Sequence, residues 1–391
     1  MSSEDLPDLL YSDAERALTE SLNSLLADRF NLDKTLARTE SAETYDEGLW
    51  HAVAGELGCA GLLIPEHDGG AGASYLEAAS VAEALGTAVA PVPFLGSAVV
   101  ATAALLSVTS GAAETPAGAA TDLLRRLADG GATAALAAGF TSAPRSAFPV
   151  SVRVAGSHPG DAQAGVVRLR GTVSGVADAL PAGVLLVPAD GVPVSLYLVD
   201  VSAAGVARAP VTSLDMTRQL CDLSFEDAPG TLIASGAAAK RAVSAALTAG
   251  AGMLAAEQVG LAQRCLDMTL AYTKQRHQFA RPVGSFQALK HRLADVWVGV
   301  TQARSASRYA AACLAAGHQD TDVAVAVAKA YCSEVAVRAA EECVQMHGGI
   351  GFTWEHPAHL YLKRAKADSL GFGTADAHRA ALASLVNLPA P

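Results

Sequence analysis

Residues 276–287 read RHQFARPVGSFQ, and further along the chain residues 344–355 read VQMHGGIGFTWE. In the first segment, Arg276 followed by Phe279 offers a phosphate clamp beside an aromatic stacking face. In the second segment, the paired glycines behind Gln345 allow a ligand to approach bare backbone. Both segments border sequence with the apolar spacing of helices. Together they predict a binding site for a phosphate-bearing ligand on helical elements of the C-terminal half.

The composition is that of a globular protein with more than one domain. A chain of 391 residues exceeds one ordinary core, so we expect two or three domains. No stretch reads as a membrane span, and the acidic, amphipathic N-terminus is unlike a secretory signal, which predicts a cytoplasmic protein. The net charge of -11 argues against a nucleic-acid binder. The cysteines lack metal-ligand spacing, so we expect no metal site and six reduced core thiols: Cys59, Cys221, Cys265, Cys313, Cys332 and Cys343.

The period of the apolar residues divides the chain into three parts. Residues 1–130 have helical spacing, with one loop of Pro65, Gly69 and Gly70 that leads back into a helix around Ser74. Residues 131–232 alternate with a period of two, as in VSLYLVD and CDLSFED. The helical period returns in residues 233–391. The sequence therefore predicts an N-terminal all-α domain, a middle β-domain and a C-terminal bundle of four long helices.

The order and spacing of the two opening segments resemble those of the acyl-CoA dehydrogenase family, especially its bacterial members. The resemblance implies an α+β multidomain fold, with an N-terminal helical domain, a middle antiparallel β-barrel or sandwich, and a C-terminal four-helix bundle that forms a tetramer core. It implies FAD as cofactor, α,β-desaturation of an acyl-CoA substrate in lipid or steroid catabolism, and an electron-transfer flavoprotein or similar acceptor. It also implies a homo-oligomer, or a hetero-oligomer with a homologous dehydrogenase subunit.

The resemblance assigns cofactor contacts to particular residues. Those implied at the pyrophosphate and adenosine of FAD are Arg276, Gln278, Phe279, Phe286 and Gln287, joined by Gln345, Gly348 and Gly349 from a neighbouring subunit. Those implied elsewhere on FAD are Thr374 and Thr141 at the flavin and Asp376 at the adenosine. Two simpler interpretations stand beside these: Arg276 as a cation at a helix C-terminus, and the paired glycines as a helix cap. Ala280 replaces the family's usual glycine.

The expected catalytic base is missing. Desaturation needs a carboxylate that removes the α proton while the flavin takes the β hydride. The family places this base either where this chain has Phe372 or, on an earlier helix, where it has Gly250. Glu257 is the nearest carboxylate, about 10 Å further along that helix by the rise per residue. It is a candidate base, against the alternative of a buried and paired structural glutamate.

Four functional hypotheses follow. The first is a base-lacking subunit of a heteromeric acyl-CoA dehydrogenase, whose homologous partner supplies the base and the flavin-ring contacts. The second is a self-sufficient homotetramer with a non-standard base. The third is a flavin-dependent monooxygenase on the same fold, which needs no base. The fourth is a non-enzymatic scaffold, and the retained nucleotide contacts disfavour it.

Overall fold

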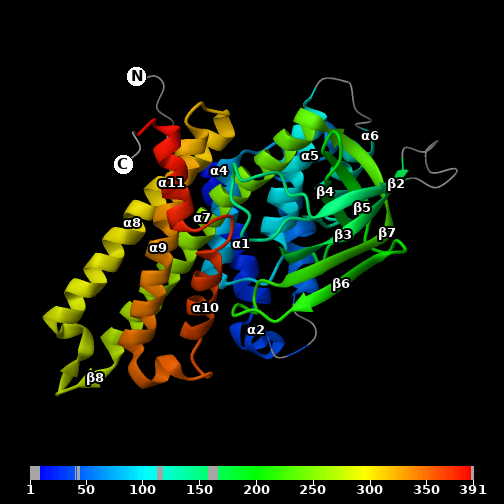
Figure 1. Ribbon diagram of the computed structural model, residues 1–391. Coiled ribbons are helices and arrows are strands. Elements are labelled where there is room, and N and C mark those ends of the chain that lie inside the picture. Colours follow the sequence, from blue (N-terminus) through cyan, green and yellow to red (C-terminus); the bar gives the residue numbers. More distant parts are fainter. Residues whose placement is uncertain (1–8, 40, 42–44, 112–117, 157–165, 389–391) are drawn as a thin grey trace. The chain divides into compact units, whose positions relative to one another are not determined.

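The computed structural model describes residues 9–39, 41, 45–111, 118–156 and 166–388 (Figure 1). The chain forms two compact units, which are described separately. The helical unit comprises residues 1–40, 75–90 and 251–391, and the sheet unit comprises residues 41–74 and 91–250. Helix α7, Gly236–Gln275, contributes residues to both.

The helical unit is built around the long helices of the C-terminal half. Its remaining helices are α1 (Asp13–Arg29), α2 (Leu32–Thr39), α4 (Tyr75–Ala88), α8 (Gln287–Ala316), α9 (Thr321–His347), α10 (Ala358–Asp368) and α11 (Ala375–Leu385). Helix α9 packs against α8, α10 and α11 (Figure 1). Among the described residues, α7, α8 and α9 are long, with 40, 30 and 27 residues, whereas α10 and α11 have 11 each. The expected four long helices are therefore three long and two short ones.

Glycine allows α4 and α7 to cross in close contact. A Cβ on Gly260 would lie 1.8 Å from the carbonyl oxygen of Glu83, and a Cβ on Gly86 would lie 2.1 Å from that of Glu257. Any side chain at these positions would push the helices apart. The Thr87 hydroxyl uses the proximity to donate to the Gly260 carbonyl oxygen at 3.2 Å.

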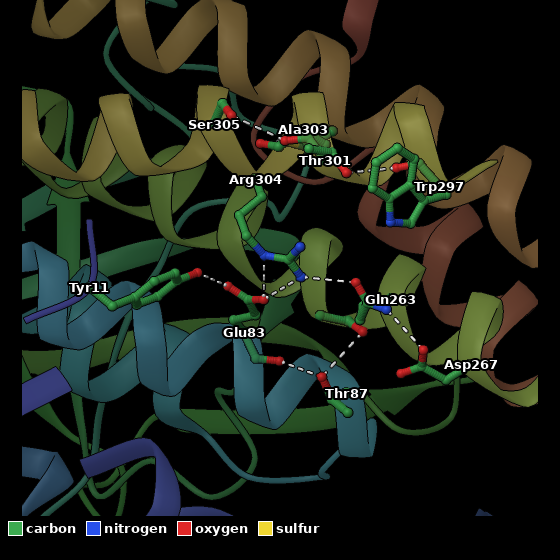
Figure 2. Close-up of polar contacts among 12 residues, drawn as sticks. Tyr11, Glu83, Thr87, Gln263, Asp267, Trp297, Thr301, Ala303, Arg304 and Ser305 are labelled. Atoms are coloured by element: carbon green, nitrogen blue, oxygen red, sulfur yellow. Dashed lines mark hydrogen bonds and ion pairs between the residues drawn. The ribbon is translucent and has the colours of Figure 1, made fainter. Parts of the chain in front are cut away.

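Polar contacts fix the N-terminal segment onto this unit. Helix α1 begins with a capping box formed by Ser12 and Glu15, and Glu15 is also paired with Arg308 of α8. Nearby, Arg304 Nη2 donates to Glu83 Oε1 at 2.8 Å, and Tyr11 donates to the other Glu83 oxygen at 2.9 Å (Figure 2). The helices therefore associate through one buried and one partly buried ion pair as well as apolar contacts.

The helical part of the sheet unit contains several short elements. These are α3 (Glu47–His51), α5 (Thr102–Thr109), α6 (Gly118–Ala128), π-helical turns at Ala52–Glu56 and Phe94–Ala101, and 3₁₀ turns at Cys59–Gly61 and Glu66–Asp68. The predicted loop at Pro65 is present, and α4 begins at Tyr75, next to the expected Ser74. A Cβ on Gly70 would lie 2.1 Å from the Ile64 carbonyl oxygen, so this turn requires glycine.

Seven strands form one sheet, in the order β1-β4-β5-β7-β3-β2 with β6 also paired to β7, within the described part of the chain. Their bounds are β1 Ala134–Leu136, β2 Val152–Gly156, β3 Val166–Ala177, β4 Val184–Ala189, β5 Ser195–Asp200, β6 Val206–Val211 and β7 Leu220–Ser235. All pairings are antiparallel except β1 with β4, which is parallel. The expected antiparallel domain is thus a mixed sheet. The long connection between β1 and β4, which contains β2 and β3, allows these two strands to pair in parallel.

All six cysteines are buried free thiols, as predicted. Burial raises the pKa of the Cys59 and Cys332 thiols to about 12, which keeps them protonated. Among the described helices, none combines the length and apolar character needed to cross a bilayer.

Candidate nucleotide site

The segment after α7 forms a strained hairpin. Strands β8 (His277–Gln278) and β9 (Arg281–Pro282) pair antiparallel through a two-residue turn. Both turn residues, Phe279 and Ala280, have positive φ, at 53° and 63°. This geometry normally selects Asn or Gly, because a Cβ is disfavoured there. The hairpin lies at one end of the helix bundle and leaves the Phe279 ring 86% exposed (Figure 1).

Aromatic contacts give the hairpin a defined shape. The Phe279 ring meets the Phe286 ring edge-on, with centroids 6.2 Å apart. The Arg281 guanidinium lies over the Phe286 ring, 3.9 Å from its centroid. Phe286 is thus half-buried between two hairpin residues, and it directly precedes Gln287 at the start of α8.

The end of α9 lies beside the end of α7. The Tyr272 and His347 rings stack with centroids 4.5 Å apart, one turn before Arg276 and one residue before Gly348. Gly348 has φ 63° and ψ -139°, a conformation that only glycine adopts readily. A Cβ on Gly348 or on Gly349 would meet no atom within 4 Å. The two glycines therefore present bare backbone to open space, as predicted.

Four polar side chains of the two segments have no partner among the described residues. Arg276, Gln278, Gln287 and Gln345 are exposed, and within the described residues their side chains form no hydrogen bond or ion pair. A guanidinium and three amides can donate to anionic oxygens, and the adjacent Phe279 can stack on a planar ring. These groups fit the pyrophosphate and adenosine parts of FAD. The sequence-predicted nucleotide residues of the two segments are thus brought together.

Thr374 and Asp376 lie elsewhere on the bundle. Thr374 is the N-cap of α11, and its hydroxyl oxygen accepts the Ala377 amide at 3.2 Å. The Thr374 proton remains available to donate to a ligand, whereas Asp376 is already paired with Arg379 at 3.2 Å. The turn before Thr374 contacts Lys329 of α9, roughly sixteen residues before Gln345, which is about 24 Å along the helix. The two groups of predicted contacts are therefore far apart within one chain (Figure 1).

The position of the family's base carries a buried aromatic ring. Phe372 is 6% exposed, and the His378 Nε2 donates to its carbonyl oxygen at 2.9 Å. Glu257 is also buried, and Arg364 Nε donates to its Oε1 at 2.8 Å. Of the two interpretations of Glu257, this contact favours the buried, paired structural glutamate.

Thr141 belongs to the sheet unit. It lies exposed in the turn where the Ser142 amide donates to the Gly139 carbonyl oxygen at 2.8 Å. The preceding Phe140 is buried under the Arg218 guanidinium, 5.4 Å from its ring centroid. The contact between Phe140 and Arg218 thus anchors the turn, and Thr141 lies at the surface.

Comparisons with known proteins agree with these features. A family model described as "Acyl-CoA dehydrogenase, C-terminal domain" matches residues 240–386, and one described as "Acyl-CoA dehydrogenase, N-terminal domain" matches residues 12–115. The acyl-CoA dehydrogenase IpdE2 of Mycolicibacterium smegmatis is 34% identical over 90% of this chain and 93% of its own. The chain belongs to the acyl-CoA dehydrogenase family. Acyl-CoA dehydrogenases are FAD-dependent oxidoreductases that act on CH-CH bonds.

Solved structures extend the likeness over nearly the whole chain. A chain of the ChsE4-ChsE5 complex from Mycobacterium tuberculosis is 26% identical, with a TM-score of 0.84 over 98% of this chain and 100% of that one. A variant of the Tcur3481-Tcur3483 steroid ACAD is 28% identical, with a TM-score of 0.81 over 96% of this chain and 98% of that one. The predicted family and fold are confirmed.

Sequence reasoning missed three side chains that contact the elements carrying the candidate site residues. Tyr272 and His347 hold the hairpin beside the paired glycines, and Lys329 contacts the turn before Thr374. For Lys329 a signal was present, because this lone charge interrupts the apolar run VAVAKAYC. For the two rings, only the approach of α7 to α9 reveals the contact.

Proposed function

We propose that this chain is the base-lacking subunit of a heteromeric acyl-CoA dehydrogenase that desaturates a bulky acyl-CoA thioester. In such an enzyme, this chain contributes nucleotide contacts to a flavin site shared with a homologous partner. The partner brings the carboxylate base and contacts to the flavin ring. Electrons then pass to an electron-transfer flavoprotein or a similar acceptor.

The observation that carries the proposal is the identity of the groups at the base positions. Phe372 and Gly250 cannot accept a proton, and Phe372 is packed into the protein. Glu257 would have to leave its buried contact with Arg364 to act as a base, and a buried ion pair is costly to break. We therefore infer that the carboxylate that removes the substrate proton comes from another chain.

The distribution of the nucleotide residues supports a shared site. Arg276, Gln278 and Gln345, whose side chains have no partner in the described part of the chain, lie at one end of the bundle. Thr374 lies beside Lys329, about 24 Å from Gln345 along α9. A single extended dinucleotide spanning two chains would use the hairpin end of one chain and the Thr374 turn of the other. In this arrangement Phe279, which is exposed at the hairpin tip and has a positive φ, would contact the partner subunit.

Bound FAD would supply the acceptor for the β hydride. This chain's own residues would bind and orient it: Arg276 would clamp its pyrophosphate, Gly348 and Gly349 would admit it against backbone, and Thr374 would donate a hydrogen bond. Thr141 of the sheet unit would be a further flavin contact. None of these residues moves a proton of the substrate, which fits a supporting subunit.

The substrate class and assembly follow from the relatives. The ChsE4-ChsE5 protein is a complex of two named components, and the Tcur3481-Tcur3483 protein is called a steroid ACAD. By likeness to them, we infer a steroid-derived or similarly bulky acyl-CoA as the substrate of the assembled enzyme. The oligomer would be a tetramer with two copies of each subunit.

The decisive experiment is the visible spectrum and native mass of the chain alone and after coexpression with a homologous dehydrogenase subunit. We expect a colourless chain that becomes yellow only in the heteromer, which acyl-CoA then bleaches. A yellow homotetramer bleached by acyl-CoA would refute the proposal in favour of a self-sufficient enzyme. A yellow protein that needs an external flavin reductase and O2 would indicate a monooxygenase.

A further inference from the structure

We propose that Lys329 of α9 is a positioning residue that fixes the turn between α10 and α11 and so places Phe372 and Thr374. The consequence for flavin binding rests on the function proposed above, but the effect on the turn does not. Lys329 lies in the middle of an apolar helix face and is fully buried. Burying an ammonium at this position is costly unless each of its protons is donated to a hydrogen-bond acceptor.

Each donor of the Lys329 ammonium has an acceptor. Nζ donates to Ser333 Oγ at 2.7 Å, to the Asp368 carbonyl oxygen at 3.0 Å and to the Gly373 carbonyl oxygen at 3.4 Å. Asp368 is the last residue of α10, so its carbonyl lacks a partner within the helix. Gly373 directly precedes Thr374, the N-cap of α11. One side chain thus connects the end of one helix to the beginning of the next.

The turn needs such support because its backbone is unfavourable by itself. Phe372 has φ 51° and Gly373 has φ 97°. A bulky residue in the left-handed region persists only where surrounding contacts determine it. His378 holds the Phe372 carbonyl oxygen at 2.9 Å, and Lys329 holds the next carbonyl along the chain. The two side chains together fix consecutive peptide groups of the turn.

The charge of Lys329 is balanced inside the same unit. The Asp368 carboxylate favours the charged form of Lys329, and its Oδ2 lies 3.6 Å from Arg364 Nε. Arg364 in turn donates to Glu257. The cluster therefore contains two cations and two carboxylates. An apolar residue in place of Lys329 would leave the Asp368 and Gly373 carbonyls without this donor and one carboxylate without its counter-charge.

Hydrogen exchange of the chain without flavin tests the positioning directly. The Gly371 amide donates to the Ala367 carbonyl oxygen and the Gly373 amide to the Leu370 carbonyl oxygen, both at 3.2 Å, so both report on the turn. Lys329→Met keeps the length and removes the donors. We expect exchange of these amides to accelerate about tenfold or more, with α8 unchanged. Unchanged exchange, or an equal acceleration over the whole unit, would overturn the proposal.

Two further variants sharpen this experiment. Lys366→Met makes the same substitution at an exposed lysine of α10 that pairs with Glu341, and it should leave the turn unchanged. If Lys329→Met does not fold, Lys329→Gln retains an amide donor on a shorter chain and should produce a smaller acceleration confined to the turn. A Lys329→Gln protein with wild-type exchange at Gly371 and Gly373 would also contradict the proposal.

The flavin readout separates this inference from the proposed function. In the assembled heteromer, we expect Lys329→Met to weaken FAD binding about tenfold and to alter the visible circular dichroism of the remaining flavin. Wild-type affinity and dichroism despite a loosened turn would show that the turn does not contact FAD. If no assembly of the wild-type chain binds FAD, the proposed function fails, whereas the exchange result still decides the role of Lys329.

Discussion

Arg364 Nε donates to Glu257 Oε1 at 2.8 Å, and both side chains are buried between α7 and α10. This contact gives the nearest candidate base a structural role. Its carboxylate compensates a guanidinium that is almost fully buried and that also lies near Asp368, so Glu257 and Arg364 stabilise each other. The relationship also links α7 to the turn that carries Phe372, through Asp368 and Lys329.

Glu257→Gln should therefore destabilise the protein. Removing one charge of a buried pair leaves Arg364 with only the more distant Asp368 carboxylate, and we expect a loss of about 3 kcal/mol in the free energy of unfolding. Urea denaturation measures it. Glu334→Gln, in the exposed pair with Arg379, is the matched control and should have no measurable effect. A fully stable Glu257→Gln protein that no longer reduces flavin would instead support Glu257 as the base.

The paired glycines should respond differently to alanine. At Gly349, a methyl group meets open space and φ is ordinary, so Gly349→Ala should keep the fold and lower FAD affinity by blocking the backbone approach. At Gly348, the positive φ adds a loss of about 1–3 kcal/mol in stability. Thermal unfolding and FAD titration of the heteromer separate the two effects. Wild-type affinity in Gly349→Ala would argue against a ligand at this surface.

Arg276→Ala should lower flavin retention without unfolding the chain. A lost charge-assisted bond to a phosphate corresponds to about tenfold or more in affinity. Flavin content of the purified heteromer is the measurement. Arg338→Ala provides the control, because Arg338 is an exposed arginine of α9 that pairs with Asp295. Equal flavin content in the two variants would remove the role proposed for Arg276.

Ala280→Gly should stabilise the hairpin. Ala280 has φ 63°, and relief of that conformation is worth about 1 kcal/mol. The same substitution at exposed Ala271, within α7, should cost about 1 kcal/mol because glycine is a poor helix former. Chemical denaturation of both variants tests the opposite signs. A destabilising Ala280→Gly would mean that the turn relaxes in solution.

Lys329 should make stability depend on pH. Burial lowers the pKa of Lys329 to about 8, opposed by the Asp368 carboxylate, whereas an unfolded lysine titrates near about 10.4. Between these values the unfolded chain binds more protons, so this contribution to stability rises with pH. Between pH 7 and 9.5, we expect the free energy of unfolding of wild type to increase by about 2 kcal/mol relative to that of Lys329→Met.

The contributions of the other titrating groups near Lys329 cancel when the two proteins are compared. Cys332, Asp368 and His378 face it, and Arg364 and Glu257 complete the charge cluster; all are present in both proteins. Lys366→Met, compared with wild type in the same way, should give no pH-dependent difference. Parallel curves for wild type and Lys329→Met would show that Lys329 keeps an ordinary pKa.

The residue types of the candidate nucleotide site could be read from the sequence. Arg276, Gln278, Phe279 and the paired glycines lie within short segments, and their chemical types are sufficient to indicate a phosphate and a stacking face. The sequence also places Phe372 and Gly250 at the two positions where the family carries its base, and neither side chain can accept a proton wherever it lies. The strain at Phe279 and Ala280 could not be foreseen, since a dipeptide without Gly or Asn does not normally predict a turn with two positive φ values.

The sequence by itself determined the family, the succession of helix, sheet and helix, and the residue types at the nucleotide site, because these depend on local periodicity and on groups close together in the chain. Only the tertiary structure decided the roles of Glu257 and Lys329. Their partners, Arg364 and Gly373, are distant in sequence, and burial makes each charge depend on which helices meet there. The same holds for Gly260, whose small size matters only because α4 crosses α7 at that point.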